Sequence, residues 1–188
     1  MSDDGETRDG FRFHGGSLPL DFAATLRGRL REPRELLETP GDLGRWLVAA
    51  GLAKRKPAVA REELEEARAL REAIYDLALA RANGAPYPPK DRALLNRWAS
   101  RPAPAPRLEA EGVRWTQEGV AALLSALART AVELLGGELG DRIRRCAGDR
   151  CATLFVDTSR SGHRKWCSMT ACGNKAKVAA FRDAQRKS

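Results

Sequence analysis

The sequence predicts an α+β fold that is mainly α: a multihelical N-terminal domain with a minor β-hairpin, followed by a small unit made of a hairpin and a C-terminal helix. Three observations lead to this fold class. Apolar residues recur at helical spacing over residues 11–140. All four cysteines lie between Cys146 and Cys172. The 188 residues, 43% hydrophobic and 31% charged, suffice for one medium domain plus a small appendage.

The N-terminal segment contains a short strand and a helix. Residues 1–10 are polar, show no periodicity and are expected to be disordered. Phe11–Phe13 alternates apolar and basic positions before a His-Gly-Gly turn, which is typical of a short strand. Apolar residues then recur at every fourth position from Leu18 to Leu30, which predicts a helix over this stretch.

Four further segments are predicted to be helices, and one is predicted to be a hairpin. Apolar stripes and terminal signals predict helices over Pro40–Ala50, Val59–Ala82, Asp91–Ser100 and Gln117–Leu135. Residues 101–115 begin with a proline-rich stretch that cannot be helical, so a hairpin is expected there. The helices can bury one another's apolar stripes and are therefore expected to form a single body.

The cysteines have the spacing of a metal site, Cys146-x4-Cys151-x15-Cys167-x4-Cys172. A tetrahedral zinc ion with four thiolates needs two turns of chain that each present two sulfurs, and a connector that brings the turns together. A reducing compartment keeps thiols free, which favours a metal over disulfides. Because four cysteines close the coordination shell, we expect one structural zinc ion and no catalytic metal.

The residues around the cysteines predict the parts of a treble-clef-like finger. Residues 152–157 have the composition of a strand, and 163–167 are expected to be the strand that returns beside it. A final helix is predicted over Ala171–Gln185, with Cys172 in its first turn. Because a unit of this size cannot bury a sufficient core, we expect its folding to depend on zinc.

The basic excess is confined to this C-terminal unit. The formal net charge is +8, with 12 Lys and Arg against 3 Asp and Glu in residues 142–188, and 21 against 22 in residues 1–141. A phosphate polyanion is the natural partner of such a segment. The candidate nucleic-acid-binding residues are Arg160, His163, Arg164, Lys165, Asn174, Lys175, Lys177, Arg182 and Arg186.

Composition argues against a membrane protein, and the motifs argue against an enzyme. The sequence has no run of 18 apolar residues, and it begins with acidic residues where a signal peptide is basic, so we expect a cytoplasmic protein with no membrane partner. It contains no nucleotide-binding loop, no paired catalytic acids and no nucleophile with a plausible base, so no enzymatic activity is expected.

The helical domain contains a candidate polar site. Asp21 and Arg71 occur in apolar-rich helices, and they are expected to form a partly buried pair that is either structural or ligand-binding. Four other residues belong either to the core or to a pocket for a small-molecule effector. They are Trp46, Tyr75, Asn96 and Trp98.

Short stretches in the C-terminal unit form a recognisable pattern. Besides the cysteine pairs, they are Leu154-Phe155-Val156-Asp157, Arg164-Lys165-Trp166-Cys167-Ser168-Met169 and Cys172-Gly173-Asn174-Lys175. The pattern resembles the CGNR zinc finger of bacterial proteins, and this resemblance implies DNA binding by the finger. The signature tetrad ends here in Lys175 in place of arginine, which preserves the charge but not the bidentate geometry.

The N-terminal part carries a second pattern. It consists of Phe13-His14-Gly15-Gly16, Leu20-Asp21-Phe22, the stretch from Leu37 to Leu52, and Leu70-Arg71-Glu72-Ala73-Ile74-Tyr75. These motifs resemble the ABATE domain of bacterial stress-induced transcription regulators. Together with the composition and the cysteine spacing, the resemblance predicts three parts: a disordered N-terminus (1–10), a helical ABATE-like domain that is a candidate sensor (11–140), and a CGNR-type zinc finger with four cysteine ligands (141–188).

The leading hypothesis is a transcription regulator that binds DNA through the finger and receives its input through the helical domain. One finger has too small a footprint for genomic specificity, so a homodimer is expected. The alternative is a zinc-stapled interaction or RNA-binding protein with no sequence-specific DNA readout. Binding to single strands would depend on stacking by Trp166.

Overall fold

The computed structural model describes residues 6–116, 119–148 and 151–186, and this part of the chain is mainly helical, as predicted. The helices are α1 (Leu18–Ala23), α2 (Pro40–Ala49), α3 (Arg61–Ala82), α4 (Pro89–Ala99), α5 (Val120–Gly136) and α6 (Asn174–Arg186). The strands pair as antiparallel two-stranded sheets: β1 (Glu6–Arg8) with β2 (Phe11–Phe13), β3 (Leu26–Arg27) with β4 (Arg34–Glu35), β5 (Ala105–Glu109) with β6 (Gly112–Thr116), and β7 (Ile143–Arg145) with β8 (Leu154–Val156).

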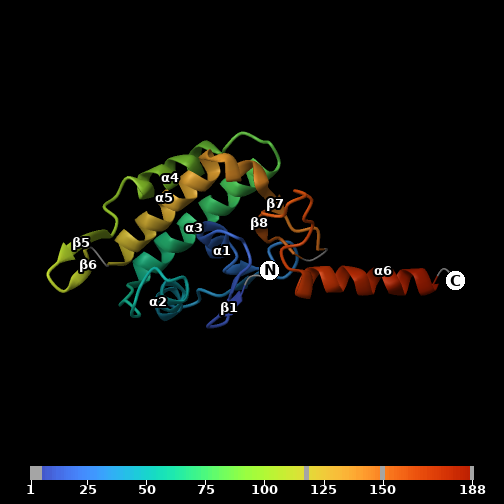
Figure 1. The fold of residues 1–188 in the computed structure, drawn as a ribbon, viewed down its shortest axis with the longest axis horizontal. Helices are drawn as coiled ribbons and strands as arrows, with labels where there is room; N and C mark the ends of the chain where they lie inside the picture. The colour runs from blue at the N-terminus through green and yellow to red at the C-terminus, as the bar shows by residue number, and fades with distance from the viewer. Residues whose placement is uncertain (1–5, 117–118, 149–150, 187–188) are drawn as a thin grey trace.

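Helices α3, α4 and α5 form the main layer of the body, and they lie side by side in Figure 1. Helix α1 packs against α3 and α5 from the other side. The apolar stripes meet in one core, in which Trp46, Leu70 and Leu124 have no exposed surface. The body is therefore held together by the apolar faces that the periodicity of the sequence indicates.

The helix boundaries follow local signals. At the start of α2, the Asp42 backbone N–H donates to Thr39 Oγ1 at 3.3 Å, and the Thr39 N–H donates to Asp42 Oδ2 at 2.7 Å, which completes a capping box. Gly51 follows the helix with a φ of 73°. The predicted start of the helix from Gln117 falls on residues 117–118, which lie outside the described residues.

Two expectations for the N-terminal segment are wrong. The helix predicted from Leu18 to Leu30 ends at Ala23, because the Thr25 hydroxyl donates to the Phe22 carbonyl at 2.7 Å and Gly28 then turns the chain with a φ of 65°. Leu30 is 52% exposed, so the fourth-residue spacing does not extend the buried face that far. Residues 6–10 are not disordered, since β1 pairs with β2; residues 1–5 lie outside the described part.

The hairpin of the C-terminal unit is formed by different residues from those predicted. Strand β8 falls within the predicted strand 152–157, but its partner is β7, which precedes Cys146. The first cysteine pair therefore lies in the loop of the hairpin. Residues 163–167 run beside this loop without forming a strand, and the Lys165 carbonyl accepts a hydrogen bond from the Ala147 N–H at 2.8 Å.

The hairpin β7–β8 packs into the body, whereas α6 projects away from it (Figure 1). Ile143, Leu154 and Val156 belong to the core of the helical body. The Val156 N–H also donates to the carbonyl of Gly15 at 2.8 Å, which joins the hairpin to the His-Gly-Gly turn. Phe181 on α6 is 63% exposed, so this helix leaves the body after its first turns.

Candidate metal centre and nucleic-acid interface

The four cysteines Cys146, Cys151, Cys167 and Cys172 converge on one point. Their sulfur atoms all lie within 4.8 Å of one another. The Sγ atoms of Cys151 and Cys172 are each 3.8 Å from that of Cys167, too far for a disulfide. A tetrahedral zinc site with Zn–S bonds of about 2.3 Å has sulfur–sulfur edges of about 3.8 Å. The residues therefore fit one structural zinc ion with a closed shell.

Backbone groups around the cysteines favour the thiolate form that zinc requires. The N–H groups of Gly148 and Cys167 donate to Cys146 Sγ at 3.5 and 3.4 Å. Hydrogen bonds with Cys146 and Cys167 lower the pKa of Cys151, whereas the hydrogen bond with Cys146 raises the pKa of Cys167 and burial raises that of Cys172, so a cation is needed to hold all four as thiolates. At Gly148, an added Cβ would lie 3.3 Å from Cys172 Sγ, so glycine keeps this loop close to the second pair. Residues 149–150 of this loop lie outside the described residues.

The loop after β8 is held by a buried carboxylate. Asp157 Oδ1 accepts hydrogen bonds from the N–H and the hydroxyl of Ser159 at 2.9 and 2.5 Å, and Oδ2 accepts one from the Arg164 N–H at 2.9 Å. Burial alone would raise the pKa of Asp157, but the hydrogen bonds outweigh burial and the pKa is lowered. The ionised carboxylate therefore shapes the turn that carries Arg160 and His163.

Arg164 is half-buried and contacts the backbone of the second cysteine pair. Its Nε donates to the Trp166 carbonyl at 2.9 Å and its Nη2 donates to the Cys167 carbonyl at 2.5 Å. The guanidinium also lies over the ring of Phe155, 4.9 Å from the centroid. In the structure the side chain braces the backbone of the second cysteine pair, and its contact with phosphate stays a prediction.

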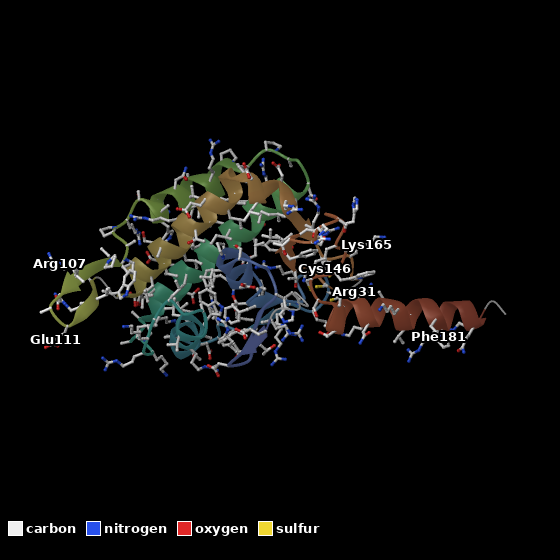
Figure 2. All side chains as sticks on the ribbon, viewed as in Figure 1. Arg31, Arg107, Glu111, Cys146, Lys165 and Phe181 are labelled. Atoms are coloured by element: carbon white, nitrogen blue, oxygen red, sulfur yellow. The ribbon has the colours of Figure 1, made fainter. Side chains whose placement is uncertain are left out.

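The other candidate nucleic-acid residues divide into two exposed groups. Arg160, His163 and Lys165 lie on the loop between β8 and the second cysteine pair; Figure 2 shows Lys165 at the outer edge of this loop. Those on α6 are also exposed, and they are Asn174, Lys175, Lys177, Arg182 and Arg186. A one-turn π-helix, Met169–Gly173, contains Cys172 and leads into α6, so the zinc site fixes the base of the helix.

The predicted pairing of Asp21 with Arg71 is wrong. Both side chains are buried, but Arg71 binds Glu35 through two hydrogen bonds of 2.5 and 2.7 Å. Asp21 Oδ1 instead accepts a hydrogen bond from the Gly15 N–H at 2.7 Å. Sequence spacing could not reveal Glu35 as the partner. It lies on β4, and this hairpin exists only because α1 ends at Ala23. Arg71 is thus part of a structural ion pair in the body.

The aromatic candidates have separate roles. Trp46 and Trp98 are buried in the core, whereas Asn96 is exposed. Trp166 is half-buried and packs against the small cluster of cysteines and Phe155. Tyr75 is half-buried and lines a cleft of about 770 Å³ between the body and the base of α6.

Sequence reasoning missed the basic side of this cleft. Arg12, Arg27 and Arg34 of the body line it together with Lys175 of the finger, and Arg31 lines it near the base of α6 (Figure 2). The near-neutral net charge of residues 1–141 gives no sign of these arginines, because acidic residues elsewhere in the same range offset their charge in the total. The Arg-rich run of residues 27–34 was the available signal.

The fold and the site define a zinc-stapled helical protein with a basic C-terminal helix, and comparison with known families agrees with this class. Residues 16–138 match the ABATE family, described as "Putative stress-induced transcription regulator", and residues 142–185 match the CGNR zinc finger. The chain belongs to the ABATE family and carries a CGNR zinc finger, which confirms the resemblance predicted from the motifs.

Three further findings bear on the function of this chain. No curated protein matches it. Within the described residues, no helix combines the length and the apolar character that crossing a membrane requires. The two families found are of the regulator and zinc-finger types and are not enzyme families.

Proposed function

We propose that the protein is a DNA-binding transcription regulator whose structural zinc finger presents a basic surface to the phosphate backbone. The observation that carries this proposal is α6, a 13-residue helix that projects from the body with its basic residues exposed. An α-helix of this kind fits the major groove of B-DNA. The family description supports the regulatory role.

In this proposal the zinc ion has a mechanical role. It anchors Cys172 at the base of α6 and the loop of the β7–β8 hairpin to the same point. Lys175, Lys177 and Arg182 contact phosphates, and Asn174 offers an amide to a base edge. Arg160, His163, Lys165 and Arg186 extend this surface. No enzymatic step is proposed, because four cysteines leave zinc no open position for water.

Duplex binding fits the structure better than single-strand binding. Stacking platforms for single strands need exposed aromatic faces. Trp166, the aromatic residue nearest the basic loop, packs against the cysteine cluster. We further propose that the protein acts as a homodimer, because a single finger contacts too few base pairs for specificity. We also propose that it acts in the cytoplasm and that a small-molecule effector controls it.

The test is duplex DNA binding by the full-length, zinc-loaded chain, measured by fluorescence anisotropy over a salt series. The triple variant Lys165→Gln, Lys175→Gln and Arg182→Gln should bind at least tenfold more weakly. Its plot of log affinity against log salt should be less steep by up to about 3, since each lost phosphate contact removes about 0.9 from the slope.

A second triple variant provides the matched control. Arg61→Gln, Arg92→Gln and Arg107→Gln remove the same charge from exposed arginines of the body, and Arg107 lies at the end opposite the finger (Figure 2). The control variant should keep nearly all of the affinity. Equal losses of DNA affinity in both variants would show that net charge alone determines binding, and this result would reject the proposed surface. Tighter binding of single-stranded DNA or RNA than of the duplex would favour an RNA-binding or interaction protein.

A further inference from the structure

We propose that the cleft between the body and the base of α6, which we call the basal cleft, binds a small phosphate-bearing ligand through Arg12, Arg27 and Arg34. The site is distinct from the proposed DNA surface except at Lys175, which lines the cleft. That such a ligand regulates DNA binding rests on the proposed function; the binding site itself does not.

The basal cleft has the size and the walls of a small-molecule site. Its volume of about 770 Å³ lies within the usual range for ligand pockets. Apolar side chains from both the body and the finger form part of its walls, and the zinc ligands Cys151, Cys167 and Cys172 form another part. The apolar side chains include Ala23, Ala24, Leu26, Leu154, Ala171 and Ala176. A partly open hollow of this size, with arginines of the body and Lys175 of the finger in its lining, fits a compact ligand better than the broad backbone of a duplex.

Three arginines of the cleft, Arg12, Arg27 and Arg34, lie close enough for their charges to act on one another. Arg27 and Arg34 are direct cross-strand partners in the β3–β4 hairpin, an arrangement that costs stability for like charges. In the described part of the chain, neither they nor Arg12 form an ion pair, and Glu32 is the one acidic residue in the lining. Three mutually repelling cations around one hollow are the environment that a phosphate group would stabilise.

A neighbouring arginine shows the contrast. Arg29 also lines the cleft, but it binds Glu72 and lies over the ring of Tyr75, 4.0 Å from the centroid. Its charge is therefore neutralised within the protein. Arg27 is half-buried and has no such partner among the described residues; burial and the charges of Arg12 and Arg34 lower its pKa. The charge of Arg29 is thus neutralised by Glu72, whereas Arg27 and Arg34 line the cleft without an ion pair among the described residues.

The experiment uses pyrophosphate as the probe, with the full-length, zinc-loaded protein and ionic strength held constant with sodium chloride. Thermal unfolding should shift upward with millimolar pyrophosphate, because a ligand of the folded state stabilises it by mass action. The variant Arg12→Gln, Arg27→Gln and Arg34→Gln should lose this shift. The control variant Arg61→Gln, Arg92→Gln and Arg107→Gln should retain it. Zinc content is measured in each preparation.

Several outcomes would overturn the proposal. Two of them concern the pyrophosphate shift: its absence in the natural protein, and an equal loss of it in the control variant. The third is a lower melting temperature of the ligand-free Arg12→Gln, Arg27→Gln and Arg34→Gln variant, which would mark these arginines as structural. An unchanged or higher melting temperature of that variant supports it, because the substitutions relieve like-charge repulsion.

Duplex DNA binding by the same variants separates this proposal from the proposed function. Removal of the three cleft arginines should weaken duplex binding no more than the control substitutions do. A loss as large as that of the Lys165, Lys175 and Arg182 variant would make the cleft part of the nucleic-acid surface and overturn the proposal. Failure of the finger variant to affect DNA, with the pyrophosphate shift intact, would reject the DNA-binding surface alone.

Discussion

Asp21 is the residue whose surroundings have the clearest consequence for pH dependence. Its carboxylate is buried beneath the His-Gly-Gly turn and accepts a hydrogen bond from the Gly15 N–H. Burial raises the pKa of Asp21 from 3.8 to about 7, although the hydrogen bonds and the charge of Arg8 oppose the rise. The folded protein therefore binds a proton at this site more tightly than the unfolded chain does.

This pKa shift predicts a stability that decreases as pH rises from about 4 to about 7. The decrease from this group is about 4 kcal/mol, at about 1.4 kcal/mol for each pKa unit, and it is complete above pH 7. Asp21→Asn keeps an oxygen that can accept from Gly15 and removes the charge. Urea denaturation at pH 4, 6 and 8 should show the variant to be more stable than the natural protein at pH 8 and similar to it at pH 4. Lower stability of the variant at pH 8 would contradict this prediction.

Arg164 and Lys165 are adjacent basic residues with different expected roles. Arg164→Ala removes the hydrogen bonds to the carbonyls of Trp166 and Cys167, which should destabilise the finger by about 1–3 kcal/mol and speed zinc release. Lys165→Ala should leave zinc release unchanged and weaken only DNA binding. The measurement is zinc transfer to a chromogenic chelator. Equal rates in the two variants would show that the Arg164 hydrogen bonds do not brace the site.

At the scale of elements, predictions from the sequence are correct where the signals are local. Helix α2 begins at its capping box, and α3 ends just before Gly84, which has a φ of 65°. The partner of β8 could not be predicted in this way, because strand pairing depends on contacts between distant residues. Ile143 is both an apolar strand residue and a part of the body's core, and the sequence shows neither role.

The candidate site likewise contains residues that local sequence signals predict and residues that depend on contacts between distant parts of the chain. The four zinc ligands could be predicted because metal geometry constrains cysteine spacing directly. The surroundings of Arg164 could not, since its partners are backbone carbonyls that any sequence supplies. Arg12, Arg27 and Arg34 of the basal cleft come from strands β2, β3 and β4, and only the fold brings Arg12 beside the other two.

The turn that joins α1 to the finger depends on a glycine. A Cβ at Gly15 would lie 2.7 Å from Leu20 Cβ and 3.0 Å from Asp21 Oδ1. Gly15→Ala should therefore lower the free energy of unfolding by about 1–3 kcal/mol. Gly136→Ala is the control: its Cβ would meet nothing within 4 Å, and helix propensity should make it neutral or stabilising by up to about 1 kcal/mol. Equal effects in chemical denaturation would contradict the role of the close contact.

At the scale of the whole molecule, the finger and the body share a core. Leu154 and Val156 of β8 pack with the helices. Zinc removal by a chelator should therefore lower the melting temperature of the body as well, in a single transition followed by far-ultraviolet circular dichroism. Two transitions, with that of the body unchanged, would show that the hairpin stays folded without the metal.

A small rotation at the attached end of helix α6 produces a large displacement at its free end. With 13 residues it is about 20 Å long, and it is attached to the rest of the protein at one end. A tilt of about 10° at the attached end displaces the free end by about 3.5 Å, close to the 3.4 Å rise of one base pair along a DNA strand. The basal cleft borders that attachment, so a small change of tilt there moves the basic residues at the far end by about the axial rise of one base pair.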